Sequence, residues 1–161
     1  MQAAELLDDA ERDRIVGVIS AWSNDLVASQ VAVGHEFIPG HPGDGLDRWL
    51  LRFEGVDRDF ITIWLTLDQR TLQFETQFMP CLEGHEAEVL AYLMKRNAHL
   101  LNMAFAIGPE EAIYLMGKIA AAQVTSDALD TVAGCTVAYV EDHYATAMSL
   151  AFPGRYHRRK A

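Results

Sequence analysis

Three consecutive runs of alternating apolar and polar residues constrain this chain most strongly. They cover residues 49–53, 60–67 and 72–79. An apolar side chain at every second position is typical of a β-strand, because successive side chains point to opposite faces of a sheet. The segments between the runs are too short for the crossover that a parallel pair needs. We therefore expect an antiparallel three-stranded meander, ended by Pro80, which has no N–H to donate to a ladder.

Helical periodicity flanks the meander on both sides. On the N-terminal side, Asp8 and Glu11 form a capping-box pattern ahead of an apolar stripe, which predicts a helix over about 8–30. On the C-terminal side, Thr125 or Ser126 is expected to cap a last helix that ends at residues 153–154. Gly134 lies in that helix at a cost of about 1 kcal/mol relative to alanine. We expect a close packing contact at this glycine.

The middle of the chain predicts a helix followed by a hairpin. A helical pattern covers about 83–101, and alternating runs follow at 103–107 and 113–119 with a Gly-Pro turn between them. Asn97 falls on the apolar side of this helix, where its amide must find hydrogen-bond partners. Residues 31–45 are expected to be irregular, because they are rich in glycine and proline.

The expected fold class is α+β, in the order helix, three-stranded antiparallel meander, helix, two-stranded hairpin, helix. Strands and helices do not alternate one for one, which argues against a Rossmann-like parallel sheet. An antiparallel five-stranded sheet with helices laid against it satisfies the order. A length of 161 residues fits a single domain at 1–154 and a basic tail at 155–161.

The charge is unevenly distributed along the chain. The net charge is −10, and four of the 13 basic residues lie in the tail, so the rest of the chain carries 9 basic and 23 acidic residues, a net −14. A body of this sign repels phosphate backbones, which argues against nucleic-acid binding. We expect the tail to be solvated and disordered. The alternative is that it binds an acidic partner or the acidic body itself.

The sequence also predicts a cytoplasmic protein. The N-terminus is acidic and lacks the apolar core of a signal peptide. No run approaches the ~20 apolar residues that span a bilayer, so no membrane association is expected. Cys81 and Cys135 have no metal-binding spacing and are expected to be reduced thiols.

No motif predicts catalysis, a metal or a cofactor. The chain has no GxSxG elbow, and neither cysteine has a neighbouring histidine in sequence. Gly40, Gly43 and Gly45 have the wrong order for a phosphate loop, and no lysine follows them. The residues that could bind a metal lack a recognised ligand spacing; they are His35, Glu36, His41, His85, Glu86, His99, Asp142 and His143.

The predicted strands are apolar on both faces. Trp49 is followed by Leu50, and Phe60 and Trp64 alternate with isoleucines. Such a sheet is either covered on both sides or exposes an apolar patch. Trp49, Phe60 and Trp64 are therefore the candidate apolar sheet patch, and ordinary core packing is the alternative.

Several segments together resemble a known family. They are the stretch 48–80 with its closing Phe-Met-Pro, the pair Arg96-Asn97, and Phe-Ala-Ile-Gly at 105–108 followed by Tyr-Leu-Met-Gly at 114–117. These segments resemble the YbjN-like family, especially its actinobacterial members, which are often labelled sensory transduction regulators. That family is similar in fold to the class I type III secretion chaperones. The resemblance covers about 49–152, and the segment 34–45 and the tail lie outside it.

The resemblance implies a non-enzymatic domain that forms a homodimer and binds other polypeptides. It places a candidate dimer or partner surface on the middle helix and the following strand, at Val89, Tyr92, Leu93, Arg96, Asn97, Leu100, Met103 and Phe105. The leading hypothesis is thus a cytosolic chaperone-like or regulatory protein, with itself and a client as partners. The alternative is a small-molecule-sensing domain with an apolar pocket, and an enzyme is the third class.

Overall fold

The computed structural model describes residues 6–41 and 45–160 and confirms the α+β class. The predicted meander, middle helix, hairpin and flanking helices all form in the expected order. The elements are α1 (Asp9–Ala28), β1 (Gly34–Ile38), β2 (Asp47–Glu54), β3 (Phe60–Leu67), β4 (Thr71–Met79), α2 (Glu86–Asn97), β5 (Met103–Ile107), β6 (Ile113–Ala120) and α3 (Ser126–Ala151), with short 3-10 turns on either side of β6.

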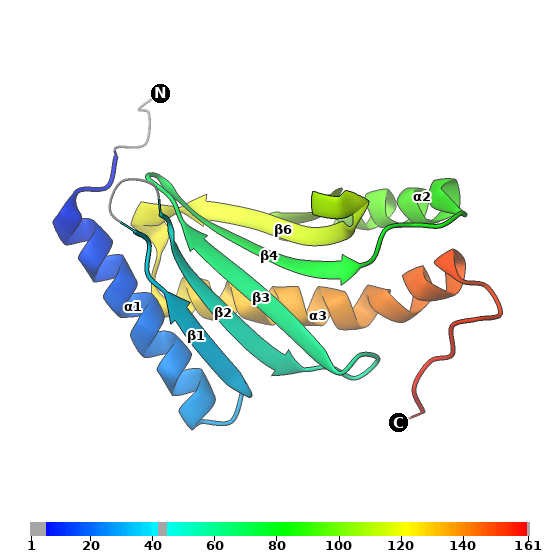
Figure 1. Ribbon diagram of the computed structural model, residues 1–161, viewed down its shortest axis with the longest axis horizontal. Coiled ribbons are helices and arrows are strands. Elements are labelled where there is room, and N and C mark those ends of the chain that lie inside the picture. Colours follow the sequence, from blue (N-terminus) through cyan, green and yellow to red (C-terminus); the bar gives the residue numbers. More distant parts are fainter. Residues whose placement is uncertain (1–5, 42–44, 161) are drawn as a thin grey trace.

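The strands form one antiparallel sheet in the order β1-β2-β3-β4-β6-β5 (Figure 1). The hairpin joins the meander through β6, which pairs with β4, and β5 forms one edge of the sheet. The other edge is β1, which pairs with β2 from Gly34↔Arg52 to Ile38↔Arg48. The expectation of five strands and an irregular 31–45 was therefore wrong. Pro39 ends this strand and does not prevent it, and residues 42–44 lie outside the described part of the chain.

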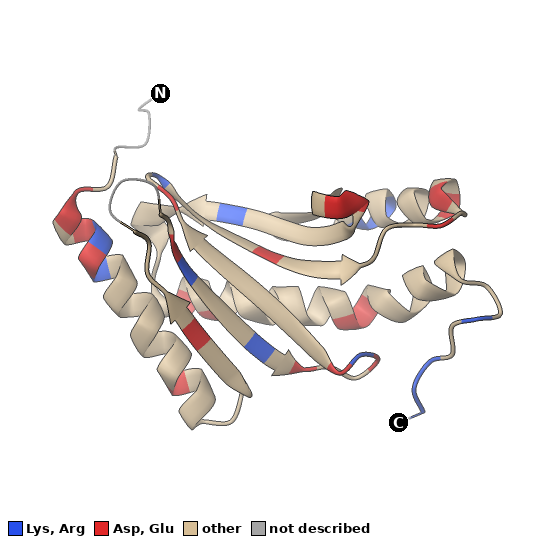
Figure 2. Cartoon of the chain, in the orientation of Figure 1, with Lys and Arg blue, Asp and Glu red and all other residues tan. Residues whose placement is uncertain are grey.

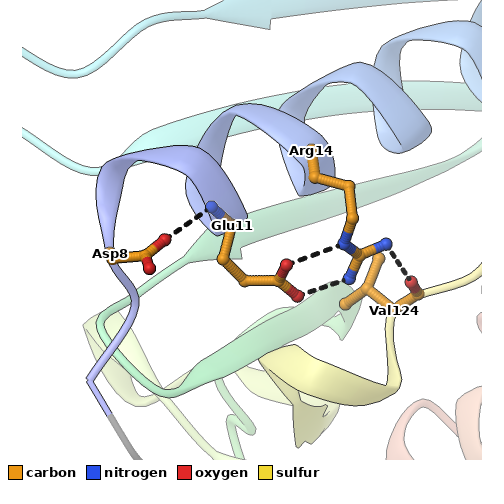
Figure 3. Close-up of polar contacts among 4 residues, drawn as sticks. All are labelled: Asp8, Glu11, Arg14 and Val124. Atoms are coloured by element: carbon orange, nitrogen blue, oxygen red, sulfur yellow. Dashed lines mark hydrogen bonds and ion pairs between the residues drawn. The ribbon is translucent and has the colours of Figure 1, made fainter.

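The start of α1 forms the Asp8 half of the predicted capping box, while the Glu11 side chain bonds Arg14 and not the Asp8 N–H (Figure 3). Asp8 Oδ1 accepts a hydrogen bond from the Glu11 N–H at 2.8 Å, as an N-cap residue should. The Glu11 carboxylate also accepts two bonds from Arg14, at 2.9 and 2.7 Å. Arg14 in turn donates to the Val124 carbonyl at 3.4 Å, so the first turns of α1 are tied to the segment that leads into α3.

α1 and α3 pack on the same face of the sheet, and α2 packs against α3 beside the edge strand β5. On this inner face the alternating side chains of β2, β3 and β4 are buried, from Trp49 through Ile63 to Phe74. They contact Ile15 and Ile19 of α1 and the apolar stripe of α3, as part of one continuous core. On the opposite, outer face, no side chain of the six strands is buried. The structure therefore has one closed face and one open face.

The basic tail binds the acidic body in this structure, which corrects the expectation of a solvated, disordered end. Arg158 Nε lies 3.1 Å from the buried Asp57 carboxylate, and Arg159 lies 2.7 Å from Asp59. Tyr156 packs edge-on against Tyr144 of α3. The weaker alternative from the sequence, a tail held by the body, is the arrangement that the structure shows.

Candidate interaction surfaces

The expected surface on α2 and β5 divides into a buried half and an accessible half. Val89, Leu93, Met103 and Phe105 are at most 8% exposed and belong to the core of the single chain. Their assignment to a contact surface is corrected: they lie on the side of α2 and β5 that packs against α3, so they support the surface from below. Tyr92, Arg96, Asn97 and Leu100 remain at least partly accessible.

Asn97 finds the partners that its apolar position requires. Its side-chain Nδ2 donates to the Phe105 carbonyl at 3.1 Å, and its Oδ1 accepts from the Phe105 N–H at 2.7 Å. The amide thus bonds both main-chain groups of a residue in the edge strand β5, as a neighbouring strand would. α2 also ends at this residue and not at 101, because the following residues turn towards β5.

Tyr92 and Arg96 form a small cluster with α3. The Tyr92 hydroxyl and His143 Nδ1 lie 3.0 Å apart, and the Arg96 guanidinium lies 4.9 Å from the centre of the Tyr92 ring. Burial lowers the pKa of His143, Asp142 opposes that shift, and Arg96 adds to it. These contacts hold α2 against α3. The exposed apolar side chains nearby are Met94, Leu101 and Ile107, with fractional exposures of 72%, 51% and 55%.

The candidate sheet patch also changes membership. Trp49 is fully buried on the inner face, and its Nε1 donates to Ser20 Oγ of α1 at 3.2 Å. It is therefore a core residue, because odd-numbered positions of β2 face the helices. Phe60 and Trp64 lie on the outer face, where Leu50 pairs with Trp64 across β2 and β3. The open patch is thus centred on β3.

A second apolar cluster surrounds β1, and the sequence analysis missed it. Five of the eleven exposed large hydrophobic residues in the described part of the chain lie within residues 31–46, with Phe37 on the inner face of the sheet and Ile38 on the outer face: Val31, Val33, Phe37, Ile38 and Leu46. The glycines and prolines of the segment concealed it. The available signal was the apolar pattern of 31–38 itself, which is strand-like up to Pro39. We call this set the β1 cluster.

A groove of about 780 Å³ adjoins the β1 cluster on the helical side of the sheet. The end of α1, residues 30–33, the end of β2 and the middle of α3 line it, and it is open to solvent. Gly134 and Ala138 of α3 form part of its wall. The expected packing contact at Gly134 is absent, since a Cβ there would meet nothing within 4 Å. Because Gly134 has no side chain, it leaves the groove wide at this point.

The residues weighed as metal ligands stay apart. Among residues 6–41 and 45–160, no three His, Cys, Asp or Glu side chains are grouped so that they could hold a metal ion. His85 does lie near a carboxylate, with Nδ1 3.6 Å from Glu88 Oε2 one turn along α2. Cys81 is exposed and Cys135 half-buried, and both are free thiols. None of the described helices is long and apolar enough to cross a membrane.

Comparisons with known proteins support the fold and leave the family open. No family model matches the chain. The chain is 27% identical over 109 residues to the uncharacterized protein ML2442 of Mycobacterium leprae, an alignment that spans 68% of this chain but only 59% of that protein. Among solved structures it is similar to a chain of the heterodimeric ExoU–SpcU complex from the type III secretion system of Pseudomonas aeruginosa. That match has a TM-score of 0.50 and 12% identity, and it covers 84% of this chain and 98% of the other.

The structural match confirms one part of the resemblance inferred from the sequence. The match covers nearly the whole of a chain from that type III secretion complex, and the α+β architecture agrees with the one expected from the sequence. At 12% identity the match shows the fold alone, because one fold carries many functions. The fold of this chain is similar to that of a chain in the type III secretion complex ExoU–SpcU.

Proposed function

We propose that this chain is a cytosolic, non-enzymatic, chaperone-like domain that binds an extended segment of another protein at the β1 cluster. The observation that carries the proposal is an open strand edge flanked by exposed apolar side chains. As the end strand of the sheet, β1 has a strand partner on one side only. An extended peptide can add to such an edge through main-chain hydrogen bonds, while its alternate side chains enter apolar pockets.

The two edges of the sheet differ in a way that favours β1. At β5, the Asn97 amide occupies the main-chain groups of Phe105, and α2 packs beside the strand. Unprotected edges invite pairing with other chains, and natural proteins usually block them. β1 instead ends in exposed Ile38 and is preceded by exposed Val33, which lines the groove.

The fold match supports this proposal without establishing it. The solved neighbour comes from a heterodimeric complex, so in that case a protein of this fold has a protein partner. Membership of the YbjN-like family and a homodimeric state are further parts of the proposal, and both rest on the resemblance. Tyr92, Arg96, Asn97 and Leu100, with exposed Met94 beside them, remain one proposed contact surface for the homodimer.

A small apolar ligand in the groove is the second candidate function. The groove volume, about 780 Å³, falls within the range of ligand pockets, roughly 300–1,000 Å³. Ligand pockets usually enclose most of the ligand, whereas this groove is open to solvent. That openness favours a polypeptide that continues onto β1.

Two helical glycines provide a matched test. Gly134→Leu places a side chain in the groove, whereas Gly17→Leu places the same side chain on an exposed part of α1 that does not line it. Both positions have free space around the Cβ, so each change should stabilise its helix by up to about 1 kcal/mol. Tagged wild type and both variants are expressed in the native cell, and the co-purified molecules are quantified by native mass spectrometry.

We expect a polypeptide that co-purifies with wild type and Gly17→Leu and that falls at least about tenfold with Gly134→Leu, which corresponds to about 1.4 kcal/mol. A small-mass adduct with the same dependence would support the ligand-sensing function instead. Equal recovery of one polypeptide by all three proteins, or recovery by none, would overturn the proposed binding site.

A further inference from the structure

The outer face of the sheet carries a charge pattern that becomes its own opposite on a two-fold rotation about β3, so that two such faces are complementary in charge. Its charged residues follow the strands: Glu36 on β1, Arg48 and Arg52 on β2, none on β3, Glu75 on β4 and Lys118 on β6. Figure 2 shows the same sequence of strands, with acidic β1 and β4, basic positions on β2 and β6, and an uncharged β3. The signs therefore run minus, plus, neutral, minus, plus across the sheet. Glu54, at the end of β2, is the exception.

We propose that this outer face binds the outer face of a second copy of the chain. A two-fold axis along β3, midway between two such faces, places β2 of one copy over β4 of the other and β1 over β6. By the strand register, Glu75 then lies opposite Leu50 with Arg48 and Arg52 two residues to either side of it, and Glu36 lies two residues from the position opposite Lys118, within reach of these long side chains. Sheets pack face to face with their strands nearly aligned, which this axis produces.

The centre of the face supplies the apolar contact. Trp64 pairs across the sheet with Leu50 on one side and Glu75 on the other, and Glu75 pairs with Met116. Trp64, Leu50 and Met116 are half-buried in the single chain and Phe60 is exposed, so each has surface left to cover. Residues 104 and 106 of β5 are alanines on this face, which leaves its far side flat. Such an apolar centre with a charged rim is typical of protein interfaces.

The charges on this face are available for a partner. Among the described residues, none of the six charged side chains on the outer face takes part in an ion pair. Arg52 lies over the Phe60 ring at 5.3 Å, and Glu75 accepts a bond from Gln73 at 3.3 Å. Arg48 and Glu75 border the same shallow hollow of about 360 Å³, with Trp64 between them.

The net charge of the face favours a second copy over other faces of the molecule. The face carries three positive and three negative groups, Glu54 included, although the whole chain carries −10. Two copies can therefore meet here without net repulsion, whereas most other surfaces would bring acidic groups together. Six strands about 4.8 Å apart, each about six residues long, present roughly 600 Å² in plan. Because the side chains protrude from this plane, the accessible area of the face is larger and comes near the ~800 Å² per partner of a standard interface.

A charge exchange tests the arrangement. Arg48→Glu and Glu75→Arg each bring like charges together twice in the symmetric dimer, while the double variant Arg48→Glu/Glu75→Arg restores the attraction between positions 48 and 75 and leaves only Arg52 beside a like charge. We expect each single change to weaken dimerisation at least tenfold and the double variant to dimerise more tightly than either single variant. Sedimentation equilibrium over about 1–100 µM measures the dissociation constants. Both residues are at the surface, and thermal unfolding checks that each variant remains folded.

Tryptophan fluorescence gives an independent readout. Trp22 and Trp49 are buried in the single chain, so only Trp64 should change environment on dimerisation. We expect a blue shift in emission as wild type is concentrated, and its absence in Trp64→Phe. Ala21→Lys on the exposed side of α1 is the matched control and should leave the dissociation constant unchanged, and Met94→Lys tests the other contact surface, on α2.

Three results would overturn the inference: a wild-type monomer at 100 µM, a double variant no better than the single changes, or dimerisation lost with Met94→Lys and kept with Arg48→Glu. The last result would assign the dimer to α2. The inference rests on the homodimer of the proposed function and not on the groove, so the Gly134→Leu experiment can fail or succeed independently of it.

Discussion

Replacing Asn97 tests most directly whether its side-chain amide stabilises the β5 edge of the sheet. Replacement by alanine removes two hydrogen bonds to Phe105, with lengths of 3.1 and 2.7 Å, from a half-buried site. Each such bond contributes about 0.5–1.5 kcal/mol net, so the free energy of unfolding should fall by about 1–3 kcal/mol. For a chain of this length that corresponds to a decrease in Tm of roughly 3–10 °C.

Urea unfolding followed by tryptophan fluorescence measures the loss, with Asn24→Ala as the matched control. Asn24 is an exposed helical residue of α1, so its replacement should change stability by less than about 0.5 kcal/mol. Amide hydrogen exchange adds a local readout. The Phe105 N–H should lose protection in Asn97→Ala, because its acceptor is removed, while amides in the central strand β3 exchange in proportion to the global loss.

Asn97→Asp distinguishes this geometry from a general loss of packing. The aspartate keeps an acceptor for the Phe105 N–H but presents a second carboxylate oxygen to the Phe105 carbonyl. This contact disfavours the charged form, so its pKa in the folded state should exceed the unfolded value of about 3.9. A raised folded pKa means that the deficit relative to wild type shrinks as the pH falls through the folded pKa. A loss below about 0.5 kcal/mol for Asn97→Ala, or unchanged exchange at Phe105, would refute the assigned role.

Two further predictions concern ion pairs that join distant segments. Burial raises the pKa of Asp47, but the hydrogen bonds from Arg12 and the Gly40 N–H lower it by more, so the pKa of Asp47 in the folded state is below its ordinary value. The Arg12–Asp47 ion pair therefore stabilises the fold above the unfolded pKa of about 3.9, and this stabilisation is lost as the pH falls through the folded pKa. Asp47→Asn should thus lower the free energy of unfolding by about 1.5–3 kcal/mol at pH 7 and make it depend less on pH in the acid range. Urea unfolding between pH 2 and 7 measures this dependence, and the same dependence as in wild type would contradict the prediction. The tail should be cleaved by trypsin after Arg158 and Arg159 faster in 1 M salt than in 0.05 M salt, because salt screens their partly exposed pairs with Asp57 and Asp59. Mass spectrometry of the released peptides measures the rates, a short arginine peptide corrects for the effect of salt on trypsin, and a corrected ratio near one would argue against the docked tail.

The sequence predicted the elements whose local patterns agree with their tertiary surroundings. The meander, the hairpin and both flanking helices have clear periodicity, and Asp8 caps α1 as its spacing indicated. β1 was missed because a five-residue edge strand between glycines carries little periodic signal, and its pairing with β2 is a tertiary contact. Tail docking was underestimated for a similar reason, since Asp57 and Asp59 lie about a hundred residues earlier.

The candidate surface was harder to predict than the fold, because an amphipathic stripe does not say which of its members reach solvent. On α2, positions 89 and 93 are buried while 92 and 96 are accessible, a difference set by where α3 lies. On β2, alternation correctly separates Trp49 from Leu50, but only the position of the helices decides which of the two faces is closed. Sequence periodicity therefore predicts which residues share a face, and tertiary packing decides whether that face is buried or exposed.

The two proposed contacts are compatible within one molecule. The outer face lies on the side of the sheet away from the helices, whereas the groove lies between α1, α3 and the end of β2. A dimer through the outer faces would therefore leave a groove and a β1 edge accessible on each copy, and could bind two segments of a partner or one segment of each of two partners. A linked pair of sites raises the effective concentration of the second contact. Arg48→Glu should then weaken capture of a partner that spans both sites while leaving capture of a single short segment unchanged, which separates the contribution of the dimer from that of the groove.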